Sequence, residues 1–206
     1  MATLPKQEWL MGRRRLLRDP DFRPWVVKAG PIRIPRFNGT PFEYLVRSIC
    51  HQQLAGKAAS TIHGRLVDLM EEVAPKPMLD QSDEALRGVG LSRGKIAAVR
   101  DLSSKILTGE VGVDDLDDQS DEEIARRLLR VRGIGDWTAH MYLMFKLRRP
   151  DIWPTTDLGV RSGFRKIHDL PELPVPKELA DLGEPHRPWR SAVAWYCYRA
   201  LEIELD

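Results

Sequence analysis

Apolar residues recur at intervals of three and four along most of this 206-residue chain, and this spacing limits its fold more than any other feature. The spacing lines up apolar side chains on one face of an α-helix. Alternation of the kind found in strands appears only at Pro31–Pro35, where two prolines oppose strand pairing. The sequence therefore predicts an all-α protein without internal repeats or low-complexity segments.

Capping residues predict where several helices begin. Thr40 precedes Pro41 and Glu43, which combines an N-cap, a first-turn proline and a glutamate three residues after the cap. Ser120 and Glu123 repeat the cap pattern later in the chain. The predicted helices are one that begins at Pro41, Ile62–Val73 with the prolines at 75 and 77 behind it, Ile96–Ile106, one that begins after Ser120, Trp137–Leu147, Leu158–Ile167 and Pro188–Glu202.

Composition excludes several classes of protein. No stretch approaches the roughly 18 consecutive apolar residues that span a bilayer, and no apolar segment follows the basic residues of positions 1–19. Cys50 and Cys197 stand alone, so the chain has neither a CxxC pair nor the thiolates of an iron–sulfur cluster. We expect a protein of a reducing compartment, with no export signal and no membrane contact.

The charge is unevenly distributed, although the formal net charge is only +2. From Arg126 to Lys166 there are ten basic and three acidic side chains, a balance of +7. Glu110–Glu123, just upstream, holds eight acids and no base. A basic segment can bind nucleic acid or can simply form a solvated face, and charge alone leaves both interpretations open.

A tight turn, Gly133-Ile134-Gly135, separates two expected helices within residues 128–139. Glycine permits a positive φ and lets another backbone approach closely. The free N–H groups that open the second helix can meet an anion. An ordinary helical hairpin also uses a glycine turn, but the frame Leu-x-Val-x-Gly-Ile-Gly followed by Thr-Ala is more specific and predicts a hairpin that cradles phosphate.

The chain resembles the helix-hairpin-helix (HhH-GPD) DNA glycosylase superfamily, in which a Gly/Pro-rich loop and an aspartate follow such a hairpin. Pro150–Arg161 matches the loop and contains Asp157 at the position of the catalytic aspartate. Ser48–Leu54 and Pro188–Val193 narrow the resemblance to the alkylpurine branch, the 3-methyladenine DNA glycosylase II type. The resemblance runs from about residue 40 to 198, with its motifs in the family's order.

The resemblance implies a bilobal helical fold with the active-site cleft between two lobes. One lobe is expected to contain residues from about 40 to 168, with the hairpin at 128–139. The other would contain about 1–39 together with 169–206. No extended β domain precedes Thr40, so we expect a compact version of the family fold.

The resemblance also implies a function: a monofunctional DNA glycosylase that flips an alkylated purine out of the duplex and hydrolyses its N-glycosidic bond in base excision repair. One alternative is an enzyme of the same fold for oxidised or mismatched bases. Another is a non-catalytic DNA-binding module. The expected partner is double-stranded DNA with damaged bases, bound by a monomer in a bacterial nucleoid or a eukaryotic nucleus.

Asp157 is the expected catalytic residue. An aspartate at the start of a helix is often a plain N-cap. Cleavage of an N-glycosidic bond, however, develops positive charge on the sugar, and a fixed anion stabilises that charge. Asp157 could also orient or deprotonate the attacking water. The sequence leaves these two catalytic roles open.

Trp137 stands where members of the superfamily that also nick the strand carry a lysine that forms a Schiff base. An indole cannot attack carbon, so no lyase activity is expected. Trp137 could be a core residue, but its face also suits an electron-poor alkylated purine, by stacking and cation–π attraction of roughly 0.5 to 2 kcal/mol. The expected base pocket contains Trp137, Trp189 and Met141, with Trp25 and Trp153 as further candidates.

The remaining expectations concern DNA contacts and an ion. Gln52 and Gln53 lie in a break between helices, and the resemblance implies that a side chain of this loop fills the gap left by the flipped base. Of the residues in this loop we choose Gln53 for that role. The expected phosphate-binding residues are Gly133, Ile134, Gly135 and Thr138. No cofactor is required, but the backbone carbonyls of Leu129, Val131 and Ile134 are expected to hold a structural Na⁺ or K⁺.

Three residues qualify the resemblance. His186 stands where the late motif of the family often opens with a tryptophan, which leaves the shape of the pocket open. Asp136 brings an anion next to the expected phosphate site, although at a helix N-terminus it can simply favour the helix. Arg190 is expected to brace the pocket wall or to pair with an acid.

Overall fold

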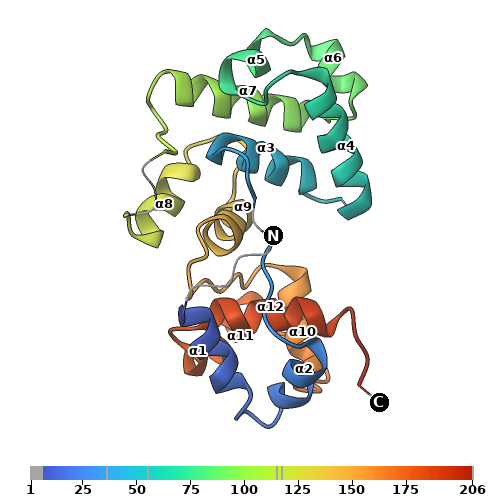
Figure 1. Ribbon diagram of the computed structural model, residues 1–206, viewed down its shortest axis with the longest axis vertical. Coiled ribbons are helices and arrows are strands. Elements are labelled where there is room, and N and C mark those ends of the chain that lie inside the picture. The colour runs from blue at the N-terminus through green and yellow to red at the C-terminus, as the bar shows by residue number, and fades with distance from the viewer. Residues whose placement is uncertain (1–6, 36, 55, 115, 117, 206) are drawn as a thin grey trace. The chain divides into compact units, whose positions relative to one another are not determined.

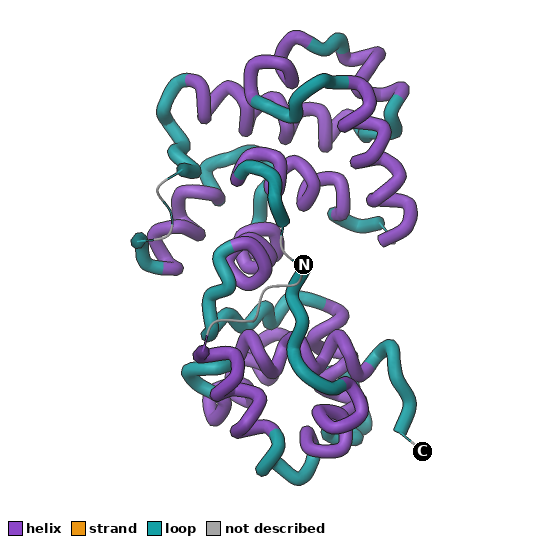
Figure 2. The backbone as a smooth tube through the Cα atoms, viewed as in Figure 1, coloured by secondary structure: helices purple, strands orange, loops and turns teal. Residues whose placement is uncertain are grey.

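The computed structural model describes residues 7–35, 37–54, 56–114, 116 and 118–205 (Figure 1). Within these ranges the backbone forms helices, turns and loops and contains no strand (Figure 2). The prediction of an all-α protein is therefore confirmed. The described helices include none with the length and apolar character that a membrane span requires.

The chain divides into two compact units. Residues 37–146 form what we call the central unit, and the described residues before 36 and from 147 onward form the terminal unit. The expected boundary near residue 168 differs from this division, because residues 147–168 group with the chain ends. The reason is packing: Gly163 lies so close to the helix over residues 190–200 that a Cβ there would come within 2.0 Å of the Cys197 carbonyl oxygen.

The central unit contains seven α-helices and a short π-helix among its described residues. Thr40 Oγ1 accepts a hydrogen bond from Glu43 N, and Ser120 Oγ accepts one from Glu123 N, so both predicted N-caps are confirmed. The helices are α3 (Pro41–His51), α4 (Gly56–Leu69), α5 (Pro75–Asp80), α6 (Asp83–Gly88), α7 (Arg93–Leu107), α8 (Asp121–Leu128), α9 (Asp136–Met141) and the π-helix η1 (Tyr142–Lys146).

Two helix boundaries in this unit differ from the predictions. The helix expected over 62–73 begins earlier and ends at Leu69, and Pro75 opens α5 instead of stopping a helix. Proline suits the first turn of a helix because its missing N–H would lack a partner there anyway. The helix expected over 137–147 is α9, continued by η1 as far as Lys146.

The terminal unit is built around one buried helix. Residues 191–197 of this helix are all buried, and the core beside them includes Trp9, Phe22 and Phe164. Leu158–Ile167 is confirmed as a helix with the predicted bounds. The elements are α1 (Gln7–Leu16), α2 (Phe22–Ala29), α10 (Leu158–Ile167), α11 (Pro176–Gly183), the 3₁₀ helix η2 (Glu184–His186) and the buried helix α12 (Arg190–Ala200).

Candidate functional site

The hairpin joins α8 to α9 through residues 129–135. Gly133 has φ +78°, and a Cβ there would lie 2.9 Å from the Cβ of Ala98 on α7. Gly135 has φ −109°, and a Cβ there would meet nothing within 4 Å. The positive φ allowed by a glycine is thus used at Gly133 and not at Gly135. The folded chain requires glycine at the first position only.

Polar contacts tie the hairpin to α7. The backbone N–H of Arg132 donates to Asp101 Oδ2 at 2.7 Å, and Lys105 Nζ pairs with the same oxygen at 2.9 Å. Burial opposes the charged form of Asp101, but these two contacts outweigh it and hold the pKa of the carboxyl below its ordinary value. Val131 and Ile134 are buried beneath the turn. These contacts and the two buried side chains therefore fix the hairpin against α7.

A cavity of about 650 Å³ borders the hairpin within the central unit. Its walls come from the start of α7, the hairpin with the first turn of α9, and the turn after α3. Lys95 and Arg132 give this cavity a basic edge, and burial lowers the pKa of Lys95. Gly135, Trp137 and Thr138 also line it. Four of the predicted base or phosphate contacts, including Gly133, thus share one hollow.

The turn after α3 is attached to the hairpin through Gln52. Its Nε2 donates to the carbonyl oxygen of Gly133 at 2.8 Å and to Thr138 Oγ1 at 2.9 Å. Gln53 is exposed, borders the same cavity and has φ +55°. Sequence reasoning placed Gln53 near DNA and assigned no contact to Gln52. The only signal for Gln52 was its place beside Gln53 in a break between helices.

Asp157 caps the N-terminus of α10. Its Oδ1 accepts a hydrogen bond from Val160 N at 2.7 Å, and the residue is 8% exposed. A Cβ on Gly159 would lie 2.8 Å from Tyr198 Cε1 and 3.1 Å from Asp157 Oδ1, so the glycine leaves room for both side chains. Burial raises the pKa of the neighbouring Cys197, and the Asp157 charge adds to that shift. Asp157 is a carboxylate held in one place inside the terminal unit.

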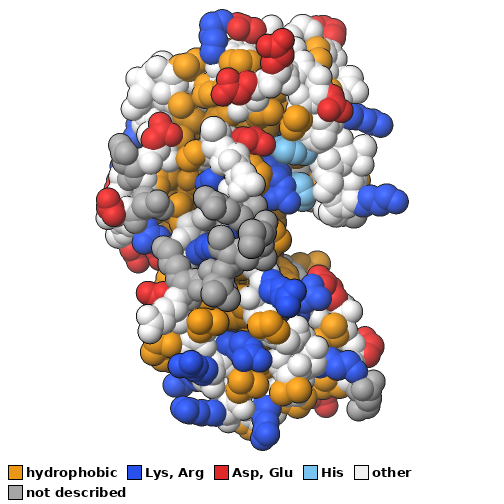
Figure 3. Space-filling view, in the orientation of Figure 1, with side chains coloured by type: hydrophobic (Ala, Val, Ile, Leu, Met, Phe, Trp, Pro, Cys, Tyr) orange, Lys and Arg blue, Asp and Glu red, His pale blue; other side chains and the backbone are white. Residues whose placement is uncertain are grey.

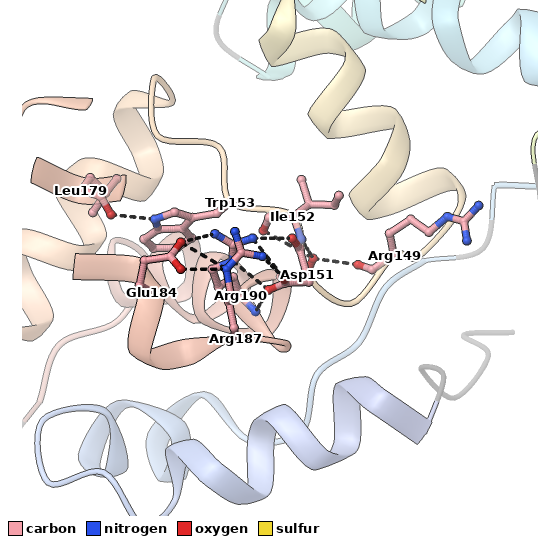
Figure 4. A network of polar contacts seen from close by, with 9 residues as sticks. Arg149, Asp151, Ile152, Trp153, Leu179, Glu184, Arg187 and Arg190 are labelled. Carbon is pink, nitrogen blue, oxygen red and sulfur yellow. Dashed lines mark hydrogen bonds and ion pairs between the residues drawn. The ribbon is translucent and has the colours of Figure 1, made fainter. Parts of the chain in front are cut away.

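A polar network holds the loop that leads to Asp157 (Figure 4). Arg190 binds both carboxylate oxygens of Asp151, at 2.8 and 2.9 Å, and contacts Glu184 Oε1 at 3.1 Å. Arg187 pairs with the same two acids at 2.7 and 2.9 Å. The expectation that Arg190 pairs with an acid is confirmed. Two arginines and two acids therefore fasten the start of α12 to the loop.

Ser191 adds backbone contacts to this loop. Its hydroxyl donates to the carbonyl of Arg149 at 2.7 Å and accepts from Ile152 N at 2.9 Å. Trp153 is buried, and its Nε1 donates to the carbonyl of Leu179 at 2.7 Å. The indole of Trp153 is thus part of the core that supports the loop.

The other aromatic candidates divide between the two units. Trp137 lies half-buried in the first turn of α9, and Met141 is buried at the end of that helix. Trp189 lies half-buried before α12 in the terminal unit, with the Arg15 guanidinium 5.9 Å from its ring centre. Trp25 is a buried residue of α2. Trp137 and Trp189 are thus only half-buried, whereas Trp25 is buried.

The structure shows where His186 and Asp136, the two residues that depart from the family pattern, lie. His186 is buried in the terminal unit with its ring 5.5 Å from that of Phe22, and burial lowers its pKa. Asp136 is exposed at the first position of α9, where a negative charge favours the helix dipole. His186 is therefore part of the core of the terminal unit. Asp136 lies at the N-terminal end of α9, where the helix dipole stabilises its negative charge.

The hairpin carbonyls fit the donor set of a hard monovalent cation. In the described backbone, Val131 O accepts a hydrogen bond from Ile134 N at 3.1 Å, whereas no backbone hydrogen bond ends on the carbonyls of Leu129 or Ile134. Each carbonyl oxygen has two lone pairs, so all three can still accept a ligand. Oxygen donors of this kind suit Na⁺ or K⁺.

Among the described residues, three side chains of the basic segment, Arg126, Arg130 and Lys166, form ion pairs with acids. Glu123 pairs with Arg126, and Glu110 pairs with Arg130, so the acidic segment upstream neutralises part of the basic one. The terminal unit adds exposed arginines at and after α1, and Lys and Arg side chains are visible over this unit in Figure 3. The basic segment is therefore partly a paired surface, and Arg132 of this segment borders the cavity.

Comparisons with known proteins identify the family to which the chain belongs. Residues 46–188 match the family described as HhH-GPD superfamily base excision DNA repair protein. DNA-3-methyladenine glycosylase 1 of Schizosaccharomyces pombe is 32% identical, over 79% of this chain and 73% of its own length.

Two solved structures are similar along nearly the whole chain. The 3-methyladenine DNA glycosylase of Schizosaccharomyces pombe, solved in complex with abasic DNA, has a TM-score of 0.88 at 29% identity and covers 95% of this chain and 98% of its own. The DNA-3-methyladenine glycosidase of Bacillus halodurans has a TM-score of 0.79 at 29% identity, over 97% and 92%. The chain therefore belongs to the HhH-GPD superfamily of base excision DNA repair proteins, within its 3-methyladenine DNA glycosylase branch.

Proposed function

We propose that this protein is a monofunctional DNA glycosylase that hydrolyses the N-glycosidic bond of alkylated purines, of the 3-methyladenine and 7-methylguanine type, in duplex DNA. The observation that carries the proposal is the fixed, nearly buried carboxylate of Asp157 at the start of α10. The 3-methyladenine glycosylases that match most of the chain support the substrate class. The enzyme acts as a monomer on damaged DNA, in the nucleoid or the nucleus.

Asp157 acts on the bond that breaks. Departure of the base leaves an oxocarbenium-like sugar, and an anion that is already in place stabilises this charge without reorganisation. The cap bond from Val160 engages one oxygen of Asp157. Asp157 either stabilises the sugar cation or takes a proton from the attacking water, and both roles require the carboxylate.

The hairpin holds the DNA backbone. Phosphate oxygens accept from N–H groups of the segment Gly133 to Thr138. The carbonyls of Leu129, Val131 and Ile134 would hold a Na⁺ or K⁺, which would supply positive charge beside the phosphate. Such contacts are independent of base identity. Gln53 enters the space that the flipped nucleotide leaves. Recognition of the damaged base falls to Trp137 and Met141 of the central unit and Trp189 of the terminal unit.

Base release over a panel of damaged duplexes tests the function. We expect release of 3-methyladenine and 7-methylguanine, and the panel should also contain hypoxanthine, an etheno adduct, 8-oxoguanine and mismatched pairs. Release of oxidised or mismatched bases without alkylated ones would assign the alternative activity on the same fold. Binding to every duplex without any release would make the protein a DNA-binding module.

The tryptophan at position 137 leads us to expect a product strand that is not cleaved. With water as the nucleophile, the product is an intact strand with an abasic site that breaks only after treatment with alkali or heat. Borohydride should trap no covalent adduct, because no amine occupies position 137. An adduct after reduction, or strand cleavage without alkali, would contradict the monofunctional assignment while leaving the glycosylase activity in place.

A further inference from the structure

Gln52 connects two parts of the central unit that lie far apart in the sequence. A carboxamide nitrogen carries two hydrogens, and both point at the hairpin: one bond reaches the Gly133 carbonyl at 2.8 Å and the other reaches Thr138 Oγ1 at 2.9 Å. Gly133 is in the turn, and Thr138, which is 1% exposed, is in the first turns of α9. A single side chain thus grips both the turn and the helix that follows it.

The next residue, Gln53, has a conformation that the loop itself does little to enforce. Its φ of +55° lies in the left-handed region, which disfavours residues with a Cβ. Within the loop, Gln52 N donates to the Ile49 carbonyl at 3.3 Å and Leu54 N to the His51 carbonyl at 3.4 Å, and both bonds are long. Unfavourable backbone conformations persist where the surroundings fix them. The two short bonds of the Gln52 side chain supply such a constraint immediately before Gln53.

We propose that Gln52 is a positioning residue that fixes Gln53 in register with the phosphate-binding hairpin. This inference rests on the proposed function, in which the hairpin holds the backbone and Gln53 fills the gap in the duplex. A loop that is ordered before DNA arrives loses less conformational entropy on binding. Because Gln52 is bonded to the hairpin, the hairpin and Gln53 meet the duplex at one fixed spacing.

Gln52→Met is the informative substitution, because methionine matches glutamine in length and has no donor. The hairpin should still bind phosphate, so affinity for an undamaged duplex should stay within about twofold of the parent. Single-turnover excision from a duplex should fall about tenfold, since a small misplacement of a positioned group lowers rates steeply. Gln52→Glu, which also cannot donate both bonds, should lose at least as much activity.

Gln81→Met is the matched control. The amide of Gln81 also donates to a backbone carbonyl in the central unit, that of Pro77 at 3.4 Å, and is distant in sequence from the hairpin and the α3–α4 turn. This variant should keep the excision rate of the parent. Equal losses in Gln52→Met and Gln81→Met would mean that any lost glutamine contact weakens the fold, and would overturn the proposal.

A double-mutant cycle with Gln53→Ala tests whether Gln52 acts through its neighbour. If it does, excision by the double variant should match that of Gln53→Ala alone within about twofold. Multiplicative losses would give Gln52 an independent role and overturn the proposal. An equal loss of affinity for undamaged DNA would also overturn it, because the hairpin itself would then be disturbed.

A readout without chemistry separates this inference from the proposed function. A duplex with 2-aminopurine beside a tetrahydrofuran abasic analogue reports insertion of a side chain into the gap as a change in fluorescence. The parent should change the signal, and Gln52→Met and Gln53→Ala should both abolish most of that change. If the parent releases no alkylated base but shows this pattern, the proposed function fails and the role of Gln52 stands. A normal signal from Gln52→Met overturns that role.

Discussion

The hairpin and the loop before Asp157 are held in place by different means. The hairpin combines backbone geometry, a left-handed glycine at position 133 packed on Ala98, with hydrogen bonds to the side chains of Asp101 and Gln52. The loop before Asp157 uses a dense network of side chains, centred on Arg190 and Asp151. A surface for phosphate needs free N–H groups, whereas a catalytic carboxylate needs a fixed position and little water.

Substitution of Asp157 is expected to have the largest effect on excision. If excision were unchanged, the loop before Asp157 would not hold a catalytic group, and the contrast with the hairpin would fail. Asp157→Asn keeps an oxygen that can accept from Val160 N, so folding should survive. It removes the anion opposite the sugar cation, and excision should fall by about 10² to 10³-fold. Single-turnover release of 3-methyladenine measures the loss. Unchanged release by a variant with the circular dichroism spectrum of the parent would exclude Asp157 as the catalytic group.

The second-largest effect is expected from substitution of Arg190, at the centre of the network around Asp151. Arg190→Ala leaves Asp151 with Arg187 as its remaining arginine partner. Loss of a fully buried pair costs about 3 to 5 kcal/mol, and the cost here should be smaller because Arg187 remains. We expect the Tm to fall by several degrees and excision to fall with it, while affinity for undamaged duplex is kept.

Arg199→Ala is the control for the Arg190 substitution. Arg199 also lies on α12 and pairs with Glu202 three residues further on, but this pair is partly exposed to solvent. Exposed pairs contribute about 1 kcal/mol or less, so the Tm should barely change. An Arg190 variant as stable and as active as this control would mean that the network does not position the loop.

Two glycine substitutions should separate folding from binding within the hairpin. Gly133→Ala places a Cβ against Ala98 and forces an unfavourable φ that costs about 1 to 2 kcal/mol, so it should lower the Tm. Gly135→Ala meets open space, so the fold should be unchanged while affinity for all duplexes, damaged or not, falls several-fold. Affinity for an abasic-site duplex and the ratio of excision rates for two lesions measure this. A changed lesion ratio at unchanged affinity would show that Gly135 belongs to base recognition.

The smallest expected effect concerns pH and the terminal unit. Burial lowers the pKa of His186, so the folded protein keeps this ring neutral where the unfolded chain, with an ordinary pKa of about 6.5, takes up a proton. The contribution of His186 to stability is therefore complete above that pH and is lost as the pH falls below it. Urea unfolding of His186→Phe should show a weaker decline on acidification than the parent. An equal decline would assign the acid sensitivity to other groups.

Local features of the fold could be predicted because their causes lie within a few residues. The caps at Thr40 and Ser120 and the helix that begins after Asp157 each depend on a side chain and an N–H three residues away. Helices α1, α2, α5, α6 and α11 were not predicted, and in α1 a glycine, Gly12, stands on the buried side. Only the packing explains Gly12, since a Cβ there would lie 2.7 Å from the Cβ of Ala192 on α12.

The sequence by itself determined the helical class, the capped starts of α3 and α8, the glycine turn and the aspartate that follows it, because spacing and capping act over short stretches of chain. Tertiary structure decided which side chains hold these pieces. The bonds of Gln52 span 81 and 86 residues, and those of Arg190 to Asp151 span 39. Such contacts form only when the fold brings distant segments together, so no local sequence pattern predicts them.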